Sequence, residues 1–267
     1  MNILVITPTL AESRWLAETV ASVAALPVGC RHLLVAPAAR VAELAARFPR
    51  VSVVPEPGGG MYAAINTGLA ATPDWEAFTY INDDDLLLPA FAGAVAALAG
   101  RTGEPLFAYG RVRLVNGEGR RLGAIPVSPL PRLNRDLYAQ RLEPVYQHGT
   151  LVSRAAWEHH GGFDPSYRFT GDSEYLARLC VRGVPAVRVG GEVAAFRLRP
   201  GQLTKNRPAM SAERDRVDGQ LRLIAPRLSA RHHWARLILR AANLPVYAGR
   251  VARHGFVSFD ELLERAD

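Results

Sequence analysis

Cysteine is scarce in this sequence: Cys30 and Cys180 are the only two, and they have neither CxxC spacing nor the density of a disulfide scaffold. We therefore expect free thiols in a reducing compartment. Long hydrophobic runs are also lacking, because the longest, from Ala90 to Gly100, is too short to cross a bilayer. Residues 1–3 lack the basic region of a secretory signal. These absences predict a cytoplasmic protein.

Lysine is almost missing, since Lys205 is the only one, yet the formal net charge is +7 and the sequence pI is about 9.9. Such a balance indicates an anionic partner: nucleic acid, a membrane surface or a phosphate-bearing substrate. No basic motif with interleaved aromatic residues stands in the core, so nucleic acid is not expected. The chain has 267 residues, of which 49% are hydrophobic and 21% charged, which is typical of one large or two small globular domains.

Strands and helices are expected to alternate in the first half. Short apolar runs predict strands over 3–6, 32–36, 51–54 and 78–81, and helical spacing predicts helices over 15–24, 41–48 and 61–71. This alternation predicts a parallel α/β sheet with ligands at the carboxyl ends of its strands.

The second half is less regular. Asn116-Gly117 predicts a hairpin between strands 106–115 and 120–125. Further expected elements are strands over 149–153, 187–189 and 194–198, helices over 155–160 and 173–182, and a mostly helical, basic region from residue 211.

Three adjacent carboxylates, Asp83, Asp84 and Asp85, follow the apolar strand that ends at Ile81. A hard divalent cation between these side chains and a substrate phosphate would offset their mutual repulsion. Without a cation, the same residues would form a solvated loop or a helix N-cap. Their place at the end of a central strand favours the metal site.

Three weaker signals accompany the acidic run. The glycines of segment 58–60 precede a helix, where they would cradle a phosphate or form a plain turn. Asp172 and Glu174 stand at the start of another helix and offer either an N-cap or two acids for proton transfer or metal binding. His148 precedes a strand and is either a core histidine or a ligand.

Five segments follow one another along residues 1–205. They are EPGGGMYAAINTG from Glu56, NDDD from Asn82, HGTLVSR from His148, GGFDPSY from Gly161 with DSEYLARL from Asp172, and GQLT from Gly201. In this order they resemble the family 2 glycosyltransferases of GT-A fold, in which an NSDD metal motif follows a strand.

The resemblance implies an α/β protein with a GT-A domain over 1–205, built on a mostly parallel Rossmann-like sheet flanked by helices. A basic, mostly helical extension would follow over 206–267. The implied activity is a metal-dependent, inverting glycosyltransferase that uses Mn²⁺ or Mg²⁺. It would move a sugar from a nucleotide-diphosphate donor, with UDP or dTDP expected, to a hydroxyl of a saccharide or lipid-linked acceptor in polysaccharide biosynthesis.

The resemblance also assigns residues. Asp172 matches the general base, and Asp85 with Asp83 matches the metal ligands. The positions that match the donor pocket are Thr7, Pro8, Glu12, Gly59, Gly60, Asn66, Asp83, Asp84, His148 and Glu174.

Some positions depart from the family pattern. Residues 35–37 read Val-Ala-Pro where the family usually carries an aspartate that holds the nucleotide base, and Gly58 and Ala63 replace two further aspartates. Two alternatives therefore stay open. One is a non-catalytic sugar-nucleotide or carbohydrate-binding relative. The other is a sugar nucleotidyltransferase, although its glycine-rich start is missing after Ile6.

The region from Ser211 to Gly255 interleaves arginines with leucines and Trp234. A basic helix with an apolar face and a tryptophan is typical of a helix that lies in a membrane interface, which predicts peripheral contact at the inner face of a membrane. The alternative is that the leucines pack on the catalytic domain, or on a second copy in a homo-oligomer, and leave the arginines solvated.

Overall fold

Alternating strands and helices build the first hundred residues, as the periodicity predicts. The computed structural model describes residues 1–199, 202, 206–225, 227–256 and 261. The elements of the first hundred residues are β1 (Ile3–Pro8), α1 (Leu16–Ala24), β2 (Arg31–Ala36), η1 (Ala38–Arg40), α2 (Val41–Arg47), β3 (Ser52–Pro55), α3 (Met61–Ala70), β4 (Ala77–Tyr80), β5 (Leu86–Leu87), η2 (Pro89–Phe91) and α4 (Ala92–Leu98).

The second half adds strands and helices of less regular order. They are β6 (Phe107–Val115), β7 (Arg121–Ile125), η3 (Pro131–Leu133), α5 (Asn134–Tyr138), β8 (Leu151–Ser153), α6 (Arg154–His160), α7 (Gly171–Val181), β9 (Ala186–Arg197), α8 (Arg207–Leu221), α9 (Ala230–Ala242) and α10 (Leu244–His254). The predicted hairpin forms between β6 and β7. The two strands expected over 187–189 and 194–198 are in fact one strand, β9.

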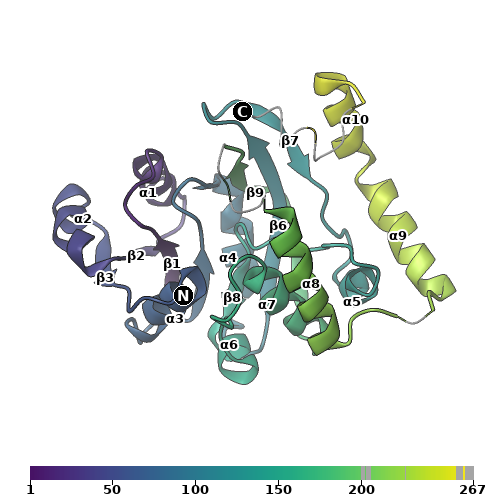
Figure 1. Cartoon of the computed structure of the whole chain (residues 1–267), viewed down its shortest axis with the longest axis horizontal. Helices are drawn as coiled ribbons and strands as arrows, with labels where there is room; N and C mark the ends of the chain where they lie inside the picture. The colour runs from purple at the N-terminus through teal and green to yellow at the C-terminus, as the bar shows by residue number, and fades with distance from the viewer. Residues whose placement is uncertain (200–201, 203–205, 226, 257–260, 262–267) are drawn as a thin grey trace.

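One mixed sheet runs in the order β3-β2-β1-β4-β8-β6-β9-β5, with β7 paired to β6 (Figure 1). Strands β1 to β4 are parallel, so the segments that follow β1, β2 and β4 meet at one edge. The side chains of β1 alternate between two core clusters: Leu4 and Ile6 pack with α3, whereas Ile3 and Val5 pack with α1 and α4.

Strand β9 crosses the sheet next to β6 and ends beside the acidic run. The pairing between the two strands shifts around Gly110, where a Cβ atom would lie 2.3 Å from Cγ1 of Val193. Only glycine therefore allows this close approach. The irregular pairing brings the end of β9, at Arg197, to the same edge as the turn after β4.

The C-terminal helices lie on one side of the molecule, with α8 against α7, α9 against α5, and α10 against β7 (Figure 1). In the part of the chain that the structure describes, no helix is both long and apolar enough to span a bilayer. Of the GQLT segment only Gln202 is described; Gly201, Leu203 and Thr204 lie outside the described residues, as does Lys205.

Candidate active site

The acidic run forms a turn in which each carboxylate has a different partner. Asp83 accepts a 2.6 Å hydrogen bond from Oγ1 of Thr9 in the loop after β1. Asp84 forms an ion pair with Arg199. Asp85 is fully buried, and its Oδ1 accepts from the backbone N–H of Arg197 at 2.8 Å. The turn therefore joins the ends of β1, β4 and β9.

Arg197 is the buried counter-charge of this turn. Its guanidinium donates to the carbonyl oxygens of Asp84 and Gly117 at 2.8 Å each and to Glu18 at 2.6 Å. Together with Arg199 it lies over the ring of Trp15, at 5.3 and 5.7 Å. Two arginines thus offset the repulsion among three adjacent carboxylates.

Burial still penalises the negative charges of the turn. It raises the pKa of Asp83 and of Asp84 above their ordinary values, and for Asp84 the neighbouring Asp85 carboxylate adds to the increase. A cation bound beside the turn would lower the cost of keeping these groups ionised.

Polar atoms without partners gather beside Asp85. Nε2 of His148 lies 3.3 Å from Oδ2 of Asp85, but neither ring nitrogen has a hydrogen-bond partner among the described residues. The buried Oδ1 of Asn82 also has none there. Oxygen and imidazole donors of this kind suit Mn²⁺, and oxygen donors suit Mg²⁺. No cluster of three or more His, Cys, Asp or Glu ligands occurs among residues that the structure describes. A cation here would therefore need further ligands from a substrate.

Asp172 lies in the first turn of α7, one residue after the position at which the helix begins. Its Oδ1 accepts a 3.0 Å hydrogen bond from the hydroxyl of Tyr62. Burial and the charge of Glu143 raise the pKa of Asp172. A Cβ atom on Gly171 would lie 2.6 Å from the Tyr62 ring, so glycine is needed for this contact. Asp172 is therefore a partly exposed carboxylate with increased basicity.

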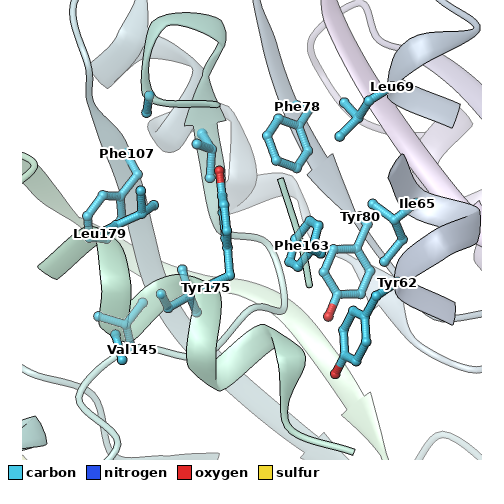
Figure 2. Packing of buried hydrophobic residues seen from close by; sticks show 14 of the residues in the cluster. Tyr62, Ile65, Leu69, Phe78, Tyr80, Phe107, Val145, Phe163, Tyr175 and Leu179 are labelled. Carbon is cyan, nitrogen blue, oxygen red and sulfur yellow. The ribbon is translucent and has the colours of Figure 1, made fainter. Parts of the chain in front are cut away.

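Aromatic rings line the space between the two ends of the site. Tyr62 stacks on Phe163 at 5.8 Å, and Tyr80 meets the same ring edge-on at 5.5 Å (Figure 2). Burial raises the pKa of Tyr80 well above its ordinary value, and the charges of Asp172, Tyr62 and Asp85 contribute. A small cavity opens here, lined by Tyr80, Gln147, Asp172 and Tyr175 among others. Asp172 therefore lines this cavity together with Tyr80, the last residue of β4 before the acidic turn.

This arrangement belongs to a known architecture. No family model and no curated protein matches the chain. Among solved structures, S. aureus TarS 1–349 in complex with UDP-GlcNAc is similar with a TM-score of 0.64 and 15% identity, over 100% of this chain and 79% of that chain. Mannosyltransferase PcManGT from Pyrobaculum calidifontis, in complex with GDP-Man and Mn²⁺, is similar with a TM-score of 0.57 and 19% identity, over 99% and 78%. The chain has the GT-A fold.

In this GT-A fold, the loop after β1 contacts the acidic turn through residues that the motifs did not mark. Thr9 and Ser13 bind Asp83 through its side chain and its carbonyl oxygen. Thr7 is fully buried, and its hydroxyl lies 3.0 Å from Nε2 of His32. Pro8, the last residue of β1, is partly exposed, and Glu12 in the loop is exposed. Thr7 therefore has a structural contact in the core, and Pro8 and Glu12 are the predicted donor residues here that are accessible to a ligand.

Two residues that are predicted to bind the nucleotide-sugar donor form hydrogen bonds within the protein. The side-chain amide of Asn66 donates to the Phe163 carbonyl at 2.8 Å and accepts from the N–H of the same residue. Glu174 binds Arg178 through both oxygens, and Arg178 also donates to the carbonyl of Gly162. Both side chains therefore fix segment 161–163, which passes under Tyr62, and their predicted donor contacts stay untested.

Gly59 and Gly60 lie in the exposed turn before α3. Their φ angles are +97° and +91°, in the left-handed region that favours glycine. The turn places backbone N–H groups ahead of the N-terminus of α3, which suits an anion. Binding of a phosphate there stays a prediction.

Two glutamates that no sequence motif marks support the position of Asp172. Glu213 of α8 accepts hydrogen bonds from the backbone N–H groups of Arg168, Phe169 and Thr170, the three residues before α7. Glu143 accepts from the hydroxyl of Ser173 and pairs with Arg214 of α8 at 3.1 Å. Neither glutamate stands in a recognisable motif, because its partners are far away in the sequence.

Proposed function

We propose that this chain is a glycosyltransferase that moves a sugar from a nucleotide-diphosphate donor to an acceptor hydroxyl, with a divalent metal ion and inversion at the anomeric carbon. The observation that carries the proposal is the buried Asp85 carboxylate, whose Oδ2 lies 3.3 Å from Nε2 of His148, a ring nitrogen without a hydrogen-bond partner among the described residues. A donor with its phosphates at Asp85 and its reacting sugar toward Asp172 would use both carboxylates.

The donor end of the site would bind the nucleotide diphosphate. Asp85 and His148 would hold the metal ion, with Asp83 as the further predicted ligand. A bound Mn²⁺ or Mg²⁺ would offset the negative charge that develops on the diphosphate as it leaves. The N–H of Arg197 and the Asn82 amide orient the Asp85 carboxylate, which lets it bind without a rotamer change.

At the other end, Asp172 would act as the general base. The proton passes from the acceptor hydroxyl to a carboxylate oxygen of Asp172 as that hydroxyl oxygen attacks the anomeric carbon on the face opposite the leaving diphosphate. The hydroxyl of Tyr62 donates to Oδ1 of Asp172, so we assign Oδ2 as the oxygen that takes the proton. The raised pKa of Asp172 makes it a better proton acceptor than an ordinary aspartate.

The nucleotide base is the least constrained part of the donor. The segment after β2 has no aspartate; Pro37 is followed by η1, from which Arg40 donates to the carbonyl of Ala11 at 3.2 Å. UDP-GlcNAc and GDP-Man, the compounds bound in the similar structures, are therefore both donors to test, together with dTDP sugars.

A thermal-shift screen tests the proposal directly. We expect one nucleotide sugar to raise the melting temperature only when Mn²⁺ is present, because a ligand of the native state must stabilise it. Transfer to a panel of saccharide and lipid-linked acceptors then separates an enzyme from a non-catalytic binder. Metal-dependent binding with no transfer or donor hydrolysis would favour the binder, and no stabilisation by any nucleotide sugar would contradict the donor site itself.

A further inference from the structure

Helix α9 presents two apolar faces, and only one of them packs on the protein. Ala235 and Leu239 are buried against Leu133 and Leu137 near α5. On the opposite face Trp234 is 62% exposed and Leu237 54% exposed. The packing alternative considered for the leucines therefore accounts for one side of the helix only.

The outer apolar face continues into α10. Residues 234, 237, 241 and 244 follow one another at intervals of three and four, which aligns them along one side of a helix. We call Trp234, Leu237, Ala241 and Leu244 the α9 stripe. Leu244 is 62% exposed, although it lies at the start of α10. Exposed apolar side chains thus occur on both sides of the break at Asn243, from Trp234 on α9 to Leu244 at the start of α10.

Helices α9 and α10 carry no acidic residue of their own. From Gly219 to Phe259 the sequence contains seven arginines and no aspartate or glutamate. Arg236 and Arg240 are exposed on α9 at a spacing of four, so they lie together along one edge of the helix. Within the described ranges no carboxylate forms an ion pair with either of them, whereas Arg231 binds Asp136 at 2.7 Å. Free positive charge therefore borders the apolar stripe.

We propose that the α9 stripe docks the protein on an anionic membrane surface. The leucines and Trp234 would enter the boundary between headgroups and acyl chains, where tryptophan is favoured, and the arginines would bind lipid phosphates. A second copy of the chain fits the surface less well. In a two-fold contact between stripes, Arg236 and Arg240 would face the same arginines of the partner, and no carboxylate of the described residues pairs with them.

The experiment is sedimentation of the full chain with vesicles of phosphatidylcholine alone or mixed with phosphatidylglycerol, at low and at moderate salt. We expect binding to the anionic vesicles only, weakening as salt rises. Trp234→Ser with Leu237→Ser should abolish most of the binding. Arg236→Gln with Arg240→Gln should weaken it by about 30-fold, since each basic residue near the surface contributes roughly 1 kcal/mol.

A matched control comes from the far side of the molecule. Arg47 and Arg50 are exposed at the end of α2, which lies opposite α9 (Figure 1). Arg47→Gln with Arg50→Gln changes the net charge equally and should leave vesicle binding within about twofold of wild type. All substituted side chains are exposed, and unchanged melting temperatures would show that the variants fold.

Three outcomes would overturn the proposal. The protein could stay in the supernatant with anionic vesicles at low salt. The α2 control could weaken binding as much as the α9 arginine variant, which would indicate unspecific attraction by net charge. Light scattering could show a dimer that Trp234→Ser with Leu237→Ser dissociates, without vesicle binding, which would make the stripe an interface between copies. None of these readouts depends on glycosyl transfer, so the proposed function can fail or hold separately.

Discussion

The acidic turn and Asp172 are supported by different parts of the chain. At the acidic turn, the partners of Asp83 and Asp85 are Thr9 and Arg197, from β1 and β9. At the other end, the loop before Asp172 is fixed by Glu213, which belongs to α8. These two partners of the acidic turn lie within the predicted GT-A domain. The position of the proposed general base, Asp172, depends on a helix that follows the predicted domain boundary at 205/206. Helix α8 is therefore part of the support of Asp172.

The two supports also differ in their electrostatics. Burial and the charge of Glu143 raise the pKa of Asp172. For Glu213, burial acts in the same direction, but hydrogen bonds from three backbone N–H groups and one hydroxyl outweigh it and lower the pKa. Ionised Glu213 thus stabilises the native state, whereas ionised Asp172 costs stability, which is common for a group that is retained for chemistry.

The largest effect is expected at Asp172 itself. Asp172→Asn should lower kcat by roughly 10²- to 10⁴-fold and leave donor affinity unchanged, because the amide keeps the shape but cannot take a proton. The melting temperature at neutral pH should be equal to wild type or higher, since a raised carboxylate pKa costs native stability above its ordinary value of 3.8. Turnover, calorimetry and thermal unfolding measure the three quantities. Near-normal turnover would make Asp172 a structural residue.

The opposite pattern is expected at the donor end. Asp85→Asn should weaken Mn²⁺-dependent donor binding by about 100-fold or more, beyond the 10- to 100-fold typical of residues that only orient a metal ligand. The amide oxygen can still accept from the N–H of Arg197, so the fold should be retained. Calorimetry with and without Mn²⁺ measures the loss. Equal donor affinity of the variant and the wild type in the presence of Mn²⁺ would mean that Asp85 does not hold the metal ion. The expected contrast between the Asp85 and Asp172 variants would then be absent.

An intermediate effect is expected from α8. Glu213→Gln removes the charge that the N–H groups before α7 bind, which should lower stability by about 1–2 kcal/mol and kcat by roughly 10-fold through displacement of Asp172. Donor affinity should stay the same. This stability is present above pH 4.5, the ordinary value for glutamate, and is lost as pH falls through the lower folded pKa.

The matched control for Glu213 is on the same helix. Asp215 binds Arg141 at 2.5 Å in an exposed ion pair, and such pairs contribute about 0–1 kcal/mol. Asp215→Asn should therefore leave kcat unchanged. If donor affinity fell in Glu213→Gln, or if Asp215→Asn lowered kcat equally, α8 would support the whole fold and not the base end.

The smallest effect is expected from Tyr62→Phe. Loss of the hydrogen bond to Asp172 should cost about 1 kcal/mol or less in stability. Because that hydrogen bond lowers the pKa of Asp172, its loss should move the acidic limb of the kcat–pH profile to higher pH. A profile measured between about pH 4 and 8 would show the shift. An unmoved limb would mean that a different group takes the proton.

Much of the donor end could be predicted from the sequence. The alternation of apolar strands and helices predicts the parallel sheet. The NDDD segment follows β4 in the sequence, and this order alone predicts that Asp85 lies at the carboxyl edge of the sheet. The support around it could not be read in the same way. Arg197 is 112 residues from Asp85, and the buried bond between them depends on how β9 pairs with β6.

Local sequence therefore determined which segments are strands, which are helices, and which acids stand at their ends, because these depend on neighbouring residues. Tertiary structure alone decided that Asn66 bonds to Phe163 and that Arg178, which Glu174 binds within α7, donates to the carbonyl of Gly162. It also decided that Glu213 supports the helix of Asp172 and that α9 leaves Trp234 in solvent. The physical reason is the same in each case. The role of a side chain depends on the residues that it contacts, and packing between segments distant in the sequence determines those contacts.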